Sequence, residues 1–168
     1  NDIARNRVCT LDREGYDRCR ADQPGRARRS GRFLADQIAP AEIAAETCFL
    51  GYDRLQWDGR VVALATGGQA VAQLDAGAEG VVVLDGTPFY AEGGGQVGDR
   101  GVLETARGDR FRVRDCRRQG DSFLHIGEVE SGRFEVGDAV SAKVDLATRE
   151  ATARHHSATH LLHAALRA

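Results

Sequence analysis

Short β-type segments separated by turn sequences fill the middle of this 168-residue chain and limit the folds open to it. The segments expected as strands are Thr47–Tyr52, Arg60–Ala65, Ala70–Gln73, Gly80–Asp85, Gly101–Glu104, Arg110–Cys116, Ser122–Val129 and Ala139–Val144. The turn sequences expected between them are Trp57–Gly59, Gly67–Gly68, Asp75–Gly77, Arg118–Asp121 and Val136–Asp138. Many short strands joined by regular turns predict a sandwich or a closed barrel.

Alternating residues indicate that these strands bury one face and expose the other. In the last segment every second residue is apolar, at Val140, Ala142 and Val144. The segment Arg110–Cys116 alternates in the same way, with arginines between Phe111 and Val113. Successive side chains of a strand point to opposite faces, so each segment has one buried face and one solvent-exposed face.

After Asp145 the pattern changes from strand to helix. Asp145 is a suitable N-cap, and neither glycine nor proline occurs in residues 146–168. Leu161, Leu162 and Leu166 form an apolar stripe on the predicted helix. No later segment of the sequence offers this stripe a partner, so we expect self-association through the terminal helix.

The first 40 residues are expected to be helical, with one interruption. Asn1–Gln23 has near-helical apolar spacing, and Pro24-Gly25 then breaks the helix. Four arginines follow in residues 26–32. Such a cluster is typical of a solvated segment and is weaker support for contact with an RNA backbone. Pro40 begins the linker to the strand-rich region.

The glycine-rich stretch Thr87–Gly101 lies between two predicted strands. Three consecutive glycines, residues 93–95, suggest positive φ or the close approach of another group. Two of them match the dinucleotide fingerprint G-x-G-x-x-G together with Gly98, but that motif requires a helix to open at the loop. Gly98–Gly101 has the composition of a turn instead. On composition alone, the stretch could equally be a glycine-rich turn that has no function, and this alternative remains.

His156 and His160 stand four residues apart in the predicted helix, which puts both imidazoles on one face. This spacing suits two ligands of one zinc ion, and it also occurs among ordinary surface or core histidines. No glutamate follows His156, so the zinc-protease motif H-E-x-x-H is absent. No cysteine follows His160, and two histidines are too few ligands for a tight zinc site.

Composition narrows the class of protein. The net charge of −2 argues against a dedicated nucleic-acid clamp but does not exclude local contact with RNA. No apolar run is long enough to span a membrane. The four cysteines are scattered without C-x-x-C spacing, which predicts reduced thiols in a cytoplasmic protein; they are Cys9, Cys19, Cys48 and Cys116.

Three stretches of the chain resemble alanyl-tRNA synthetases. Residues 87–101 read T-P-F-Y-A-E-G-G-G-Q-V-G-D-R-G and resemble the glycine-rich motif of that family and of its free-standing editing relatives. Residues 156–167 read H-S-A-T-H-L-L-H-A-A-L-R and resemble the first zinc motif of the family's editing domain. Leu11–Tyr16 resembles the end of the family's tRNA-recognition helices. The family usually continues from there as one charged helix, whereas this chain has Pro24-Gly25, which interrupts a helix.

The resemblance implies three regions and a mainly β fold. Residues 1–40 would be the end of the tRNA-recognition region. Residues 41–145 would form a small closed barrel like those of translation proteins. Residues 146–168 would be the first helix of a truncated editing domain. The expected chain is therefore a piece of a longer synthetase, with helical segments on either side of the barrel.

The resemblance also implies an activity for the parent protein. The parent would attach alanine to tRNA(Ala) with ATP and Mg²⁺, bound outside this chain, and hydrolyse mischarged Ser-tRNA(Ala) or Gly-tRNA(Ala). Two alternatives remain open. One is a free-standing editing hydrolase, which we would expect to begin near the barrel. The other is a non-catalytic barrel that only positions RNA.

Site residues follow from the same resemblance. His156 and His160 would hold zinc with a later C-x-x-x-H, which this chain does not contain, so the piece alone would be inactive. Gln96 would contact the aminoacyl group or terminal ribose, and its alternative role is to bond its own turn. The residues expected to bind substrate beside it are Gly93, Gly94 and Gly95.

Overall fold

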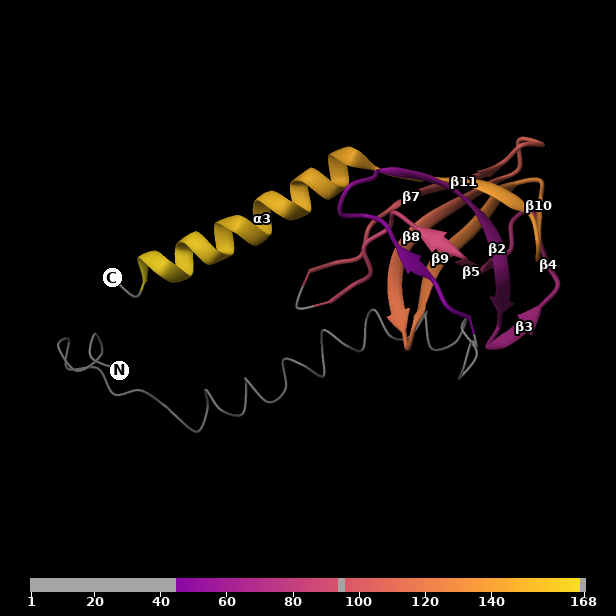
Figure 1. The fold of residues 1–168 in the computed structure, drawn as a ribbon, viewed down its shortest axis with the longest axis horizontal. Helices are drawn as coiled ribbons and strands as arrows, with labels where there is room; N and C mark the ends of the chain where they lie inside the picture. Colours follow the sequence, from indigo (N-terminus) through magenta and orange to yellow (C-terminus); the bar gives the residue numbers. More distant parts are fainter. Residues whose placement is uncertain (1–44, 94–95, 167–168) are drawn as a thin grey trace. The chain divides into compact units, whose positions relative to one another are not determined.

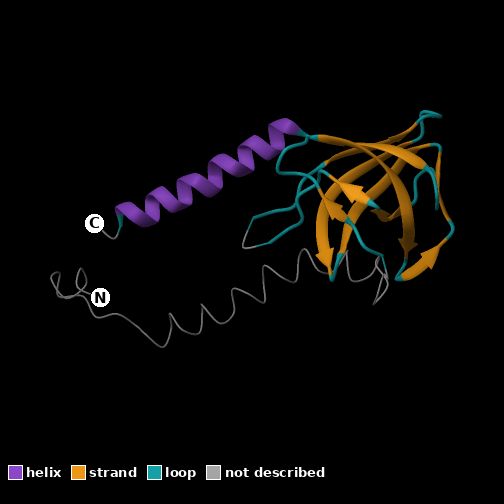
Figure 2. Cartoon of the chain, in the orientation of Figure 1, coloured by secondary structure: helices purple, strands orange, loops and turns teal. Residues whose placement is uncertain are grey.

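The computed structural model describes residues 45–93 and 96–166, and several side chains near the end of the helix are left out of that description. Figures 1 and 2 show a strand-rich body and a helix. The strands are β1 (Cys48–Phe49), β2 (Gln56–Thr66), β3 (Gln69–Val71), β4 (Gln73–Asp75), β5 (Glu79–Leu84), β6 (Gly86–Thr87), β7 (Gly101–Thr105), β8 (Arg110–Gln119), β9 (Ser122–Ser131), β10 (Arg133–Glu135) and β11 (Ala139–Val144). The helix is α3 (Leu146–Ala165). The predicted N-terminal helix, the arginine cluster, Gly94 and Gly95 lie outside the described residues.

Six strands form the barrel. Their order is β11-β7-β8-β9-β5-β2, and β11 also pairs with β2, which closes the ring. All pairs around this ring are antiparallel. Two small sheets lie beside it, a parallel pair of β1 with β6 and an antiparallel pair of β10 with β4. The expectation of a mainly β, closed barrel followed by a helix is confirmed.

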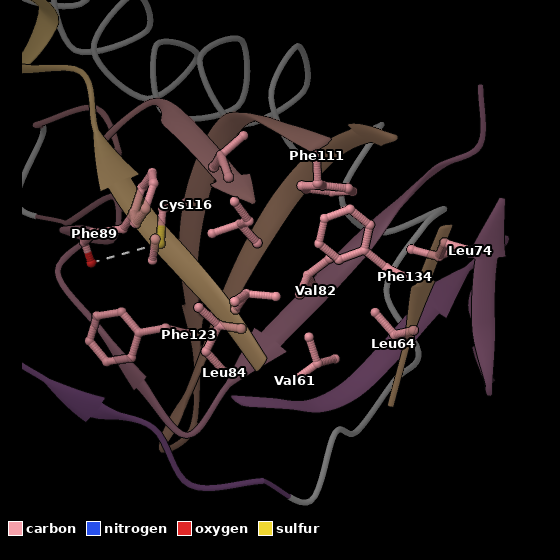
Figure 3. Packing of buried hydrophobic residues seen from close by; sticks show 14 of the residues in the cluster. Val61, Leu64, Leu74, Val82, Leu84, Phe89, Phe111, Cys116, Phe123 and Phe134 are labelled. Carbon is pink, nitrogen blue, oxygen red and sulfur yellow. Dashed lines mark hydrogen bonds between the residues drawn. The ribbon is translucent and has the colours of Figure 1, made fainter. Parts of the chain in front are cut away.

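Alternation along the strands builds the core. On β8, Phe111 and Val113 are buried while Arg112 and Arg114 are exposed. Phe111 packs edge-on against Phe134 of β10, and Figure 3 shows both rings among the clustered apolar side chains. Burying one such side chain stabilises the fold by roughly 1.5–3 kcal/mol. The predicted alternation of a buried face and a solvent-exposed face is confirmed for β8.

The turn predicted at Trp57–Gly59 is wrong, because these residues lie inside β2. The first half of β2 pairs with β11 and the second half with β5, so one long strand serves two neighbours. Gly59 fits because a side chain there would meet the Asp85 carboxylate and the Trp57 ring. Pairing between distant segments therefore overrides local turn composition.

Two predicted strands are shorter or divided. Only Cys48–Phe49 of the predicted strand Thr47–Tyr52 is extended, and a turn follows at residues 51–53. The predicted strand Ala70–Gln73 is split between β3 and β4 by a bend at Ala72. Gly67 and Gly68 both have positive φ, 57° and 76°, as a tight hairpin turn requires.

The predicted cap of the terminal helix is confirmed. The Asp145 carboxylate accepts the backbone N–H groups of Ala147 and Thr148 at 3.0 and 3.3 Å. The Thr148 hydroxyl also donates to it at 2.7 Å, and these hydrogen bonds lower the pKa of Asp145. A carboxylate at this position satisfies N–H groups that have no partner within the helix. Among the described residues, no helix is both long and apolar enough to cross a membrane.

Candidate functional site

The glycine-rich loop runs from β6 to β7 and doubles back on itself. Gly93 and Gln96 exchange two backbone hydrogen bonds, of 3.1 and 3.0 Å, as an isolated antiparallel bridge. Gln96 is partly buried, and Val97 beside it is 58% exposed. The bridge fixes the backbone of Gln96 at the outer end of the described loop.

Close approach of the backbone occurs at the base of this loop. The Glu92 N–H donates to the Cys116 carbonyl of β8 at 2.7 Å. A side chain at Gly98 would clash with that same carbonyl. The turn predicted at Gly98–Gly101 is wrong, because the chain runs from residue 97 to β7 without one.

Gly93 shows neither feature that we expected of the glycine run. Its φ is not among the positive values, and the nearest atoms to a side chain there would be 3.8 Å away. A side chain there would make only ordinary van der Waals contacts, so the described fold does not require glycine at this position. Gly94 and Gly95 fall outside the described residues.

Asp99 joins the two arms of the loop. The Asp99 N–H donates to the Tyr90 carbonyl at 2.9 Å, and the Tyr90 N–H donates to the Asp99 carboxylate at 2.7 Å. The Asp99 side chain is only 6% exposed. The backbone N–H and the carboxylate of this buried residue thus both hold the base of the loop together.

Arg149 of α3 ties the helix to this base. Its Nε lies 3.1 Å from an Asp99 carboxylate oxygen, and its Nη2 forms an ion pair with the same oxygen. It also donates to the carbonyls of Gly51 and Pro88, at 3.1 and 2.7 Å. One guanidinium therefore fixes the first turn of α3 against the segment after β1 and both arms of the glycine-rich loop.

Sequence reasoning missed Arg149, although the sequence contains one signal for it. A cation near the N-terminus of a helix is opposed by the helix dipole, and the first turn of α3 contains no acidic residue. An arginine placed there predicts an anionic partner from elsewhere in the fold. Which carboxylate it meets depends on tertiary structure, since Asp99 lies 50 residues away in the sequence.

A buried histidine supports the start of the loop. His125 of β9 is fully buried, and its Nδ1–H donates to the Val82 carbonyl at 2.9 Å. Its Nε2 then accepts from the Thr87 hydroxyl at 2.7 Å, and that oxygen accepts the Phe89 N–H at 3.1 Å. Burial lowers the pKa of His125 to about 4. The imidazole is therefore neutral and structural near pH 7.

Cys116 lies under the same loop, and its thiol is expected to be unreactive. It is fully buried, and its Sγ lies 3.9 Å from the Phe89 carbonyl (Figure 3). Burial, with the nearby Asp115 and Asp99 charges, raises the pKa of its thiol well above the ordinary value. A buried thiol with a raised pKa is a poor nucleophile.

His156 and His160 both lie in α3, four residues apart as predicted, and the description of the structure does not extend to their side chains. No cluster of three His, Cys, Asp or Glu side chains occurs in the described part of the chain. Zinc normally takes at least three protein ligands. The zinc role expected for the histidine pair therefore stays a prediction.

Comparison with known proteins places the chain in a family. The family model described as "tRNA synthetases class II (A)" matches residues 1–148. Alanine–tRNA ligases from Saccharophagus degradans, Halorhodospira halophila and Pseudomonas entomophila are 50%, 52% and 51% identical over 99% of this chain. The chain spans 19% of the length of each of these relatives. The chain belongs to the alanyl-tRNA synthetase family of class II tRNA synthetases.

Proposed function

We propose that this chain is the barrel and the start of the editing region of an alanine–tRNA ligase. The parent would charge tRNA(Ala) with alanine, using ATP and Mg²⁺ bound outside this chain, and would act in the cytoplasm. It would also hydrolyse Ser-tRNA(Ala) and Gly-tRNA(Ala). The observation that carries the editing role is the Arg149–Asp99 cluster, which joins the glycine-rich loop to the helix that contains His156 and His160.

A second hydrolytic site has a physical reason. A binding pocket discriminates weakly between amino acids that differ by a small group, because one methylene or hydroxyl changes the binding free energy little. Alanine, glycine and serine differ in this way. Hydrolysis of the wrong ester at a separate site raises the accuracy beyond what the charging pocket can reach.

In this proposal Gln96 contacts the substrate. Its amide can both donate and accept a hydrogen bond, which suits an aminoacyl group or the hydroxyls of a terminal ribose. The bridge with Gly93 holds its backbone in place. Gly94 and Gly95 would let the substrate approach backbone N–H groups.

His156 and His160 would be two zinc ligands in the parent, with the remaining ligands supplied from outside this chain. Zinc bound there would orient the substrate or polarise a carbonyl or water. Because this chain offers only two of the ligands, we expect it to be inactive alone. The regional boundaries at residues 40 and 145 and self-association through α3 also remain predictions.

A substitution at Gln96 in the full-length parent tests the editing role. We expect Gln96→His to slow hydrolysis of Ser-tRNA(Ala) about tenfold or more, because a bulkier imidazole replaces the amide and its hydrogen-bonding atoms lie at different positions. The rate of alanine charging should stay within about twofold of wild type, since charging uses another site. Rates are measured by single-turnover deacylation and by aminoacylation.

The matched control is Val97→Ala, an exposed neighbour on the same loop. It should leave both rates unchanged. Equal deacylation by wild type and Gln96→His would remove Gln96 from the site. A wild-type parent that charges alanine but does not hydrolyse Ser-tRNA(Ala) would contradict the editing role itself.

A further inference from the structure

We propose that the outer face of β11, β7 and β8 binds an RNA sugar–phosphate backbone. A cavity of about 640 Å³ lies on this face. We call it the basic groove. Its lining includes five cationic side chains and one carboxylate, and these are Arg100, Arg110, Arg112, Arg114, Lys143 and Asp145. Val102 also lines it. The proposal rests on the proposed role of the parent as a tRNA-handling enzyme.

The arginine row follows directly from the strand pattern. Arg110, Arg112 and Arg114 occupy every second position of β8, opposite the buried Phe111 and Val113. Alternate residues of a strand are about 7 Å apart. This repeat is comparable to the distance between successive phosphates along a nucleic-acid strand. A row of arginines at that interval can therefore meet consecutive phosphates.

The opposite side of the groove is also basic. Lys143 of β11 is paired in register with Val102 of β7, and Val102 is paired with Arg112 of β8. Lys143 and Arg112 thus stand two strand spacings apart, about 10 Å. The apolar Val102 lies between them. A gap of this width, with cations on both sides and a valine between them, suits a single sugar–phosphate strand.

The groove cations already have carboxylate partners. Arg110 and Arg112 pair with Glu130, and Arg114 pairs with Glu79 and Glu128. The three arginine side chains are 46%, 61% and 50% exposed. Ion pairs this exposed contribute little free energy, so an RNA phosphate can replace the carboxylates at small cost.

The make-up of the groove predicts binding that does not depend on base sequence. None of the described residues that line it is aromatic, so no ring is available to stack on a base. Arginine offers five donors in a fork that matches phosphate oxygens. Contacts of this kind position a nucleic acid without reading it, and they weaken steeply with salt.

Fluorescence anisotropy with labelled tRNA measures this binding directly. The groove variant Arg110→Gln/Arg112→Gln/Arg114→Gln should bind about tenfold more weakly than wild type at low salt. The slope of log affinity against log salt should fall by about one for each phosphate that the variant no longer neutralises. Circular dichroism and thermal melting confirm that each variant is folded.

The control variant Arg118→Gln/Arg133→Gln/Arg154→Gln changes the same charge. These arginines lie outside the groove, are 60%, 55% and 71% exposed, and are also ion-paired. We expect this variant to bind tRNA within about twofold of wild type, because exposed charges away from the site act only through the screened overall field. An equal loss of affinity in both variants would show an effect of net charge alone and would overturn the proposal.

For a second variant we expect higher affinity for tRNA, a result that misfolding of the variant would not produce. Glu128→Gln/Glu130→Gln removes carboxylates that compete with RNA for the groove arginines, so affinity should rise several-fold. Unchanged affinity in this variant, or no binding of tRNA by the wild-type chain at low salt, would contradict the proposal. Binding is measured without hydrolysis, so failure of the groove and failure of the editing role are separate results.

Discussion

At the scale of single residues, the chain uses a neutral histidine as a core hydrogen-bonding element. His125 has a partner at each ring nitrogen, Val82 on one side and Thr87 on the other. A buried polar side chain costs little when both of its polar atoms are paired. The cost arises when the histidine is charged, since the protonated ring would have to donate to the Thr87 hydroxyl from a fully buried position.

The buried state of His125 predicts a loss of stability in mild acid. Its pKa is about 4 in the folded chain and about 6.5 in the unfolded chain. As pH falls below 6.5 the unfolded state binds a proton that the folded state does not, so unfolding is favoured until the pH reaches about 4. We expect this group to destabilise the fold by about 2 kcal/mol at pH 5 relative to pH 7.

Urea unfolding of wild type and His125→Gln at both pH values measures this contribution. The loss of stability between pH 7 and pH 5 should be about 2 kcal/mol smaller in the variant, because carboxylates titrate alike in both proteins. An NMR titration of the His125 ring in the native chain provides an independent check. A ring that titrates near pH 6.5 would refute the prediction.

At the scale of elements, the glycine-rich loop and α3 depend on one buried ion pair. Arg149 and Asp99 hold the first turn of the helix at the base of the loop. Their side chains are 19% and 6% exposed, so water replaces a missing partner poorly. The site proposed above depends on this pair, because the loop contains Gln96 and the helix contains His156 and His160.

A double-mutant cycle tests this connection. Arg149→Gln and Asp99→Asn should each destabilise the fold by about 3 kcal/mol, since each leaves a buried polar partner unmatched. The double variant should cost less than the sum, with a coupling energy of roughly 1–3 kcal/mol. Urea unfolding gives these values. Additive losses would mean that the two side chains act independently.

The activity of the parent adds a readout that stability alone does not move. In folded Arg149→Gln at low temperature, kcat for Ser-tRNA(Ala) hydrolysis should fall more than KM rises, because the loop and helix no longer share one geometry. Arg149→Lys keeps the charge and should recover part of kcat. Unchanged kcat in a folded Arg149→Gln parent would restrict this residue to stability.

The barrel could be predicted from the sequence because its signals are local. Alternation along β8 and β11, together with the hairpin at Gly67-Gly68, is visible within a few residues. The Asp145 cap is visible for the same reason. These features combine side-chain periodicity with turn chemistry, and both act between neighbours in the sequence.

Other features depend on partners far along the chain and could not be predicted. Trp57–Gly59 has the composition of a turn, but pairing with β11 extends it as a strand. The position of Arg149 in the first helical turn indicates an anionic partner, but its pairing with Asp99 forms only where α3 meets the loop base. The basic groove also requires β11 and β8 to lie on either side of β7, an order that the sequence alone does not reveal.

At the scale of the whole molecule, a closed barrel presents one loop and one helix from a common base. The ring of six strands contains β7, where the loop ends, and β11, which the helix follows. The loop begins after β6, which pairs with β1. The loop and the helix offer an amide and two histidines to the proposed editing site. The remaining zinc ligands would come from elsewhere in the parent.

Hydrolysis of Ser-tRNA(Ala) in the presence of zinc tests this account most directly. The 168-residue chain is compared with the same chain extended through the next C-x-x-x-H of its parent. The account predicts hydrolysis by the extended chain only, because zinc sites normally have at least three protein ligands and the proposal assigns two of them to this chain. Hydrolysis by the 168-residue chain at the rate of the extended one would contradict it, since the barrel, Gln96 and two histidines would then suffice.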